Sequence, residues 1–296
     1  VDESGSVELV CRVEQSPSGL GWLPDDGAAD AGRMLVVSMR DRRLLRLDPD
    51  GLVEVADLSS LATWHCNDLV VDEQGRAYAG NFGSDIYGDD PTPSDALLLM
   101  VERDGAVSVA ADKMKFPNGA VITPDGSTLI ICETFAGCLT AFDIAADGSL
   151  SGRRSWAELE GVAPDGCCLD AEGAIWVATV FGNQLLRVHE GGRISDRVEL
   201  PSESFACMLG GEDGRSLFVC AATTSEPEEA LEQLGGSIEL VRVEAVSYTH
   251  LRAHETREDL VCRLLLEKKN QKYTILSYTP TITYKRSSYS PPPTCS

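Results

Sequence analysis

Hydrophobic residues occur along most of the chain in short runs of about five, separated by turns rich in Asp, Gly and Pro. Short apolar runs that alternate with turns about every ten residues are typical of antiparallel strands. Helical spacing is convincing only over residues 228–234, and the strand-helix alternation of a parallel α/β protein is missing. The pattern therefore predicts an all-β protein.

The runs are organised as a repeat. Each unit begins with a short loop, often Pro-X-Gly, followed by an apolar run, an acidic-Gly turn and a second apolar run. The units are residues 17–24, 66–83, 116–143, 163–188 and 205–222, and most continue into a third run. A period of about 40–50 residues with three or four short strands predicts the blades of a β-propeller. A solenoid is the alternative, but these repeats carry no helix and vary in length.

One position recurs near the start of each unit. It is occupied by Ser18, Asn67, Asn118, Asp165 and Cys207. Because propeller blades are related by rotation about one axis, we expect these residues to form a ring at one mouth of the channel. Amide and carboxylate oxygens around a common centre favour a hard cation such as Ca²⁺, Mg²⁺ or Mn²⁺, with Zn²⁺ also possible. Asn, Asp and Ser before Gly are also ordinary turn formers, and the two interpretations stay open here.

Composition divides the chain in two. The 296 residues carry 25 Lys+Arg and 47 Asp+Glu, a net charge of −22, and all 27 glycines precede residue 246. Residues 246–296 are instead net basic and hold five of the seven tyrosines. We therefore predict a propeller over residues 1–245 and a non-native-looking, disordered tail over residues 246–296. An acidic body argues against nucleic acid or an anionic membrane as a partner.

The ten cysteines are scattered without a C-x-x-C pair. In a chain of this length they are expected to be reduced and buried, which favours a cytoplasmic location. The chain opens with Val1 rather than Met, so we expect an upstream piece to be missing.

Four strings carry a family resemblance: HCNDLVVDEQGRAYAGNFG, FPNGAVITPDGSTLIICETFAGCLTAFDIAADGSL, APDGCCLDAEGAIWVA and FACMLGG. They resemble the gluconolactonase, senescence-marker-protein and luciferin-regenerating-enzyme family over roughly residues 17–245. The resemblance implies a six-bladed propeller with one divalent cation, Ca²⁺ first among the candidates, that hydrolyses sugar lactones or related esters. The family's first blade opens with a Gly-Glu-Gly-Pro-type loop whose glutamate is a third metal ligand, and this sequence has no such loop.

We therefore expect about five blades plus a remnant of blade one, in a chain truncated at its N-terminus. The tail string SYTHLRAHETREDLVCRLLLEKK resembles translated sequencing-adapter read-through.

The resemblance also assigns roles to residues. Asn118 and Asp165 match metal ligands, and Asp165 also matches the residue that activates water. Asn67, His65 and Asp85 match positions that contact substrate, the last of them in a variable loop. The expected function is a metal-dependent lactonase acting on a small-molecule lactone. A non-catalytic binding platform, an inactive lactonase fragment, and an aryl-ester or organophosphate hydrolase remain alternatives, and the oligomeric state is not predicted.

Overall fold

The computed structural model describes residues 5–89 and 91–247. These residues form five antiparallel sheets in which each strand pairs with its neighbour in the chain. The first sheet contains β1 (Pro17–Trp22), β2 (Met34–Ser38), β3 (Arg43–Asp48) and β4 (Gly51–Asp57). The second contains β5 (Cys66–Val71), β6 (Ala77–Asn81), β7 (Ala96–Val101) and β8 (Val107–Met114). The third contains β9 (Pro117–Ile122), β10 (Thr128–Glu133), β11 (Cys138–Ile144) and β12 (Leu150–Glu158).

The fourth sheet contains β13 (Ala163–Leu169), β14 (Ile175–Val180), β15 (Gln184–Val188) and β16 (Ile194–Glu199). The fifth has three strands, β17 (Glu203–Gly210), β18 (Ser216–Ala222) and β19 (Ser237–Arg242). A short helix, α1 (Pro227–Gln233), lies between β18 and β19, close to the predicted helical segment.

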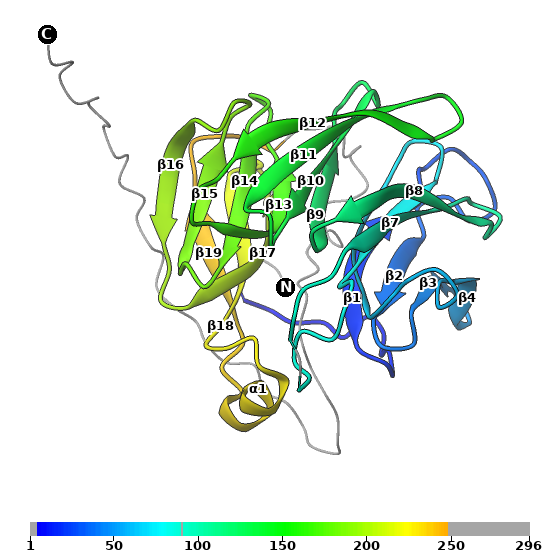
Figure 1. Ribbon diagram of the computed structural model, residues 1–296, viewed down its shortest axis with the longest axis horizontal. Coiled ribbons are helices and arrows are strands. Elements are labelled where there is room, and N and C mark those ends of the chain that lie inside the picture. The colour runs from blue at the N-terminus through cyan, green and yellow to red at the C-terminus, as the bar shows by residue number, and fades with distance from the viewer. Residues whose placement is uncertain (1–4, 90, 248–296) are drawn as a thin grey trace, which may run out of the picture.

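The sheets follow one another in chain order, from β1–β4 on the right of Figure 1, over β9–β12 at the top, to β13–β16 on the left. The first strands of successive sheets pack on one another, β1 on β5, β5 on β9, β9 on β13 and β13 on β17. This arrangement is a β-propeller with five blades, and the predicted all-β propeller is confirmed. Residues 5–16, where a remnant of a further blade was expected, contain no strand.

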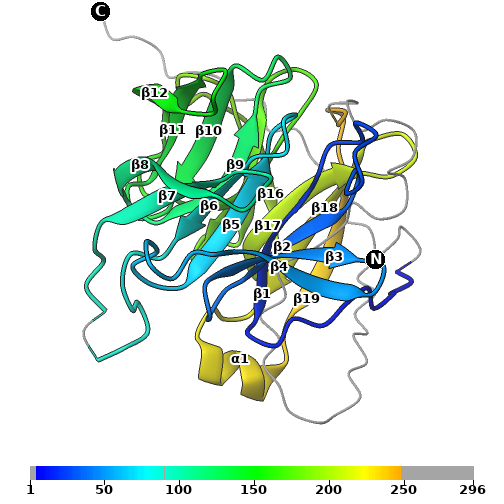
Figure 2. The ribbon, with the colours of Figure 1, turned by 90° about the vertical axis from the view of Figure 1, so that its right-hand side faces the viewer.

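The burial pattern follows the position of a strand within its sheet. Second strands such as β2, β6 and β14 are buried throughout, whereas β4, β8, β12 and β16 alternate or are largely exposed. The apolar core therefore lies between neighbouring sheets, where both faces of the second strands are covered. Helix α1 buries none of its residues and projects from the sheets (Figure 2). No helix within residues 5–89 and 91–247 is long and apolar enough to cross a membrane.

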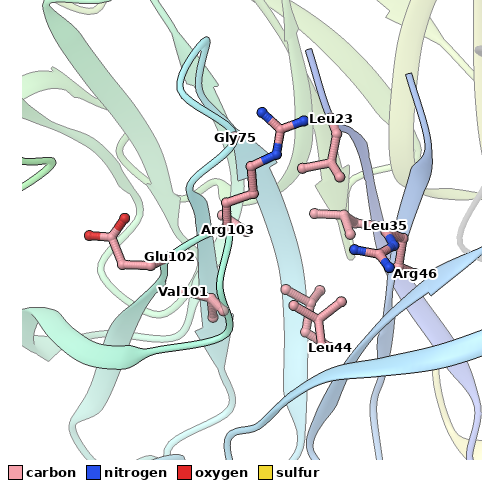
Figure 3. A pocket seen from close by; sticks show the side chains of 10 residues that line it. Leu23, Leu35, Leu44, Arg46, Gly75, Val101, Glu102 and Arg103 are labelled. Atoms are coloured by element: carbon pink, nitrogen blue, oxygen red, sulfur yellow. The ribbon is translucent and has the colours of Figure 1, made fainter. Parts of the chain in front are cut away.

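The β1–β2 loop joins the first two sheets through charge. Arg103, which follows β7, donates to Asp30 Oδ1 at 2.6 Å and to Asp26 Oδ2 at 2.5 Å. Arg46 of β3 donates to Asp30 Oδ2 at 3.2 Å and to Asp48 Oδ1 at 2.7 Å. The same two arginines line a pocket of only about 10 Å³ together with Leu23, Leu35 and Leu44 (Figure 3). That volume is near the minimum for one water molecule, so this pocket is a packing gap rather than a ligand site.

The predicted tail lies outside the described residues except for Val246 and Ser247, which pack on the fourth sheet. Ala171 N–H donates to Val246 O at 2.9 Å, and Ser247 forms an isolated bridge with Asp170. Seven cysteines of the described ranges carry free thiols: Cys11, Cys66, Cys132, Cys138, Cys167, Cys168 and Cys207.

Candidate functional site

A β-bulge near the start of each first strand positions the recurring polar residue. In four sheets, two residues of the first strand lie opposite one residue of the second, and the first of the two is the predicted ring residue. These residues are Ser18 in β1, Asn67 in β5, Asn118 in β9 and Asp165 in β13. A bulge redirects side chains out of the regular alternation of a strand and is common next to active sites. The ring residues therefore lie in bulged strands and not in isolated turns.

Glycine after the ring residue brings neighbouring strands into backbone contact. A Cβ placed on Gly119 would lie 2.6 Å from Gly166 Cα and 2.7 Å from Asp165 O. A Cβ on Gly166 would lie 2.7 Å from Ala206 Cα and 2.8 Å from Phe205 O. Only glycine fits where two backbones approach this closely, so the Pro-X-Gly pattern also serves blade packing.

The same contacts correct the fifth ring position. Gly166 meets Phe205 and Ala206 as Gly119 meets Asp165 and Gly166, and the register of β17 is irregular between Ser204 and Ala206. Phe205 therefore occupies the position that the sequence analysis gave to Cys207. Cys207 is buried two residues further on, with Sγ 3.4 Å from Trp176 O. The assignment failed because the FACMLGG string lacks the Pro-X-Gly loop that fixes the register in the other units.

A directional chain of hydrogen bonds connects the ring. Thr134 Oγ1 donates to Pro164 O at 2.8 Å, and since a hydroxyl has one hydrogen, it must accept from Asn118 Nδ2 at 3.0 Å. Asn118 Oδ1 consequently faces Asn67, whose Nδ2 donates to it at 2.7 Å. Asn67 Oδ1 in turn accepts from Ser18 Oγ at 3.4 Å. The network thus fixes the orientation of both amides, with all the ring groups buried.

Asn118 and Asp165 line one cavity of about 230 Å³. The two side chains are 2% and 3% exposed, so they form its polar floor. Thr134 lines the cavity beside them, and Ser225 and Glu226, just before α1, stand among its other polar residues. The structure therefore brings the two predicted metal ligands together, one from the third sheet and one from the fourth.

The three predicted substrate-contacting residues lie outside the lining of this cavity. Asn67 is fully buried behind Asn118. His65 is half-buried, with its ring 5.0 Å from Trp64 and 5.8 Å from Phe82, and burial lowers the pKa of its imidazole. Asp85 is half-buried in the loop after β6, where its Oδ1 accepts from Tyr87 N–H at 3.1 Å.

Sequence reasoning missed the aromatic part of the site. Phe82, Phe116 and Phe135 form a row with ring centroids 4.6 and 5.0 Å apart, and the last two line the cavity. Phe181 and Phe205 line it from the fourth and fifth sheets. A signal was present in the repeat itself. Phe116 and Phe205 stand at the start of repeat units, and Phe82, Phe135 and Phe181 each come just after the second strand of a unit, in the strings NFG, TFAG and VFG.

Glu133, the last residue of β10, lies outside the cavity lining and has a structural role. It is 2% exposed, and it accepts from Lys115 N–H at 2.7 Å and from Thr140 Oγ1 at 2.5 Å. Arg153 Nη2 donates to its Oε1 at 3.0 Å. Glu133 therefore holds the backbone at Lys115, next to Phe116 and just before β9.

The oxygen atoms at the cavity floor are of the type that hard cations bind. Asn118 Oδ1 uses one lone pair on Asn67 and keeps one, and Asp165 supplies carboxylate oxygens at the same cavity. Within the described ranges no group of three or more His, Cys, Asp or Glu side chains could hold a metal ion. The ring therefore offers a cation two protein ligands, fewer than the roughly six to eight oxygen ligands that Ca²⁺ takes.

Comparison with known proteins matches this chain to a family model and to several relatives. The family model described as SMP-30/Gluconolactonase/LRE-like region matches residues 2–223. Regucalcin of Danio rerio is 32% identical over 186 residues, 61% of this chain and 62% of that protein. A 6-deoxy-6-sulfogluconolactonase of Pseudomonas putida is 28% identical over 186 residues, 60% of this chain and 61% of that protein. The chain thus spans about three fifths of the length of these relatives.

Two solved structures share the fold. A luciferin-regenerating enzyme superposes with a TM-score of 0.65 at 20% identity, covering 80% of this chain and 81% of that one. A regucalcin from Agrobacterium tumefaciens, described as a calcium-binding protein, gives 0.60 at 20% identity, covering 78% and 77%. From the match to residues 2–223, the chain belongs to the SMP-30/gluconolactonase/LRE-like family.

Proposed function

We propose that this chain is a lactone hydrolase whose general base is Asp165. The observation that carries the proposal is the placement of the buried Asp165 carboxylate and the oriented Asn118 amide in one cavity. A binding platform needs no buried carboxylate of this kind, whereas hydrolysis needs a group that takes a proton from water.

In the proposed reaction, Asp165 accepts a proton from a water molecule as the water oxygen bonds to the lactone carbonyl carbon. The ring C–O bond then breaks, and the proton passes to the leaving oxygen, which gives one hydroxy acid per lactone and water. Asn118 Oδ1 and Asp165 would hold a divalent cation, Ca²⁺ first and Mg²⁺, Mn²⁺ or Zn²⁺ as alternatives. Such a cation supplies electrostatic stabilisation for negative charge that develops on the carbonyl oxygen.

The remaining roles stay proposals. Asn67 holds Asn118 in its orientation, and contact of Asn67, His65 or Asp85 with substrate requires a ligand that reaches beyond the cavity lining. A sixth blade with a third ligand, as the family resemblance implies, is tested by recovery of sequence upstream of Val1.

The test is hydrolysis of D-glucono-1,5-lactone and dihydrocoumarin by wild type and Asp165→Asn in Ca²⁺. Loss of the base should lower kcat by about 10²-fold or more for whichever lactone is opened. The matched control is Asp147→Asn in the exposed turn before β12, which should keep wild-type kcat. Equal kcat in Asp165→Asn and wild type would remove Asp165 from the mechanism.

A further inference from the structure

The walls above the polar floor are apolar. Nine of the fourteen residues that line the cavity are apolar or aromatic, and five of them carry aromatic rings: Tyr87, Phe116, Phe135, Phe181 and Phe205. Tyr87, Phe135 and Phe181 are 38%, 40% and 70% exposed. Large apolar side chains gathered at one concave site mark a surface that binds an apolar group.

Two of these rings are held in an unusual backbone conformation. Phe116 has φ of 60° and Phe181 has φ of 64°, in the left-handed region that bulky residues rarely occupy. Phe116 is further fixed between Phe82 and Phe135. Backbone strain of this kind persists where surrounding structure imposes it, often at ligand sites. The aromatic walls are thus set in place by the fold.

The ring position next to Asp165 is aromatic as well. Ser18, Asn67, Asn118 and Asp165 occupy four bulges, but Phe205 occupies the fifth and lines the cavity. The polar ring is therefore interrupted on the side of the carboxylate that faces β17.

Thr134 and Asn118, two of the five polar residues that line the cavity, already use part of their hydrogen-bonding capacity within the ring. Thr134 uses its hydrogen on Pro164 O, and Asn118 uses one amide hydrogen on Thr134 and one oxygen lone pair on Asn67. A sugar lactone exposes hydroxyl groups around its ring, and burying them without partners is costly. An aryl group has no such requirement and can stack on aromatic walls.

We propose that this site takes lactones or esters bearing a flat apolar group in preference to polyhydroxylated sugar lactones. The proposal rests on the proposed function for the reaction, and on the cavity lining for the substrate class. The carbonyl end lies at the floor with Asp165, and the apolar group lies between the phenylalanine walls. An engineered cavity of about 150 Å³ holds benzene, so the cavity of about 230 Å³ has room for one aromatic ring fused to a small lactone.

The kinetic test compares two six-membered lactones, dihydrocoumarin and D-glucono-1,5-lactone, on the full chain in Ca²⁺. The expected kcat/KM for dihydrocoumarin is at least tenfold higher. Phe135→Ser and Phe181→Ser, both at exposed positions, should lower the ratio of the two kcat/KM values at least fivefold. Val109→Ser, an exposed apolar residue of β8 outside the lining, is the matched control and should leave the ratio unchanged. A ratio at or below one in wild type overturns the proposal.

A binding test is independent of catalysis. Calorimetric titration with 3,4-dihydro-2(1H)-quinolinone and D-glucono-1,5-lactam, non-hydrolysed analogues of the two lactones, should give at least tenfold tighter binding of the quinolinone. Equal affinities, tighter binding of the sugar lactam or no binding of either compound overturns the proposal. Selective quinolinone binding without any Asp165-dependent hydrolysis supports the substrate class and refutes the hydrolase. Asp165-dependent hydrolysis of gluconolactone without quinolinone binding supports the hydrolase and refutes the substrate class.

Discussion

At the scale of single residues, the site depends on which way two amides point. Thr134 can give its one hydrogen only to a carbonyl oxygen, that of Pro164, so it accepts from Asn118 and leaves the Asn118 oxygen on the other side. The amide that would hold a cation is therefore oriented by a hydroxyl that itself lies just after β10. Removing that hydroxyl leaves a buried donor and a buried acceptor without their partner.

We expect Thr134→Val to lower the free energy of unfolding by roughly 1–3 kcal/mol, because valine keeps the shape and loses both hydrogen bonds. Thr134→Ser keeps the hydroxyl and loses one methyl group, so it should cost about 1 kcal/mol or less. Urea unfolding of the three proteins, followed by circular dichroism, measures both changes. Equal losses in the two variants would show that packing, and not the hydroxyl, holds the floor of the cavity.

Residue identities at the ring were predictable, but their hydrogen bonds were not. Asn67, Asn118 and Asp165 stand near the start of repeat units, and a repeat can be recognised from the sequence alone. Thr134 stands in no repeat signal, and its contact with Pro164 joins residues 30 positions apart. Orientation of an amide depends on such distant partners, so it follows only from the folded structure.

At the scale of elements, neighbouring first strands touch through glycine. Gly119 has no room for a Cβ because Gly166 Cα and Asp165 O lie within 2.7 Å of its position. Gly126 has open space around it, although its φ of 69° disfavours other residues. The two positions therefore separate the cost of steric contact between blades from the cost of backbone conformation.

Gly119→Ala should lower the free energy of unfolding by about 2 kcal/mol or more, because the added methyl group pushes β9 away from β13. Gly126→Ala carries only the cost of a left-handed alanine, about 1–2 kcal/mol. Denaturant titration of both variants measures whether Gly119→Ala lowers the free energy of unfolding more than Gly126→Ala does. A Gly119→Ala protein that is as stable as wild type would contradict the backbone contact between these strands.

The strand pattern was predictable at this scale because each apolar run and acidic-Gly turn is local. The register was less so. Phe205 took the ring position predicted for Cys207, since the FACMLGG string lacks the Pro-X-Gly loop that marks this position in other units. The aromatic walls were missed for a different reason, because Phe135 and Phe181 come from turns that meet at one cavity only when the sheets pack.

At the scale of the whole molecule, the ion pairs between the first two sheets give stability a dependence on pH. Hydrogen bonds from Arg103, on the second sheet, lower the pKa of Asp26 and Asp30 on the first, and within the first sheet a hydrogen bond from Arg46 lowers the pKa of Asp48 to about 2. A carboxyl whose pKa is lower when folded stabilises the protein above its unfolded pKa, near 4. That contribution is lost as the pH falls through the folded value.

Thermal unfolding should therefore show Arg103→Met less stable than wild type at pH 7, by about 1–3 °C in Tm. The gap should narrow between pH 4 and pH 2, where Asp26 and Asp30 become protonated in both proteins. Arg154→Met breaks a pair with Asp143 inside the third sheet and serves as the control for loss of an exposed arginine. A gap for Arg103→Met that stays constant down to pH 2 would show that these pairs do not link the sheets.

A cation at the cavity floor would connect two blades, because Asn118 belongs to β9 in the third sheet and Asp165 to β13 in the fourth. An ion that binds the folded chain alone stabilises it by about 2.7 kcal/mol at a concentration one hundred times its Kd. For a domain of this size that corresponds to a rise in Tm of about 5–10 °C.

We expect Ca²⁺ to produce this rise in wild type and in Asp147→Asn, and a chelator to reverse it. In Asp165→Asn the loss of a carboxylate ligand should remove most of the rise, measured as the difference in Tm with and without Ca²⁺. An equal rise in Asp165→Asn would place the stabilising ion elsewhere on this acidic molecule.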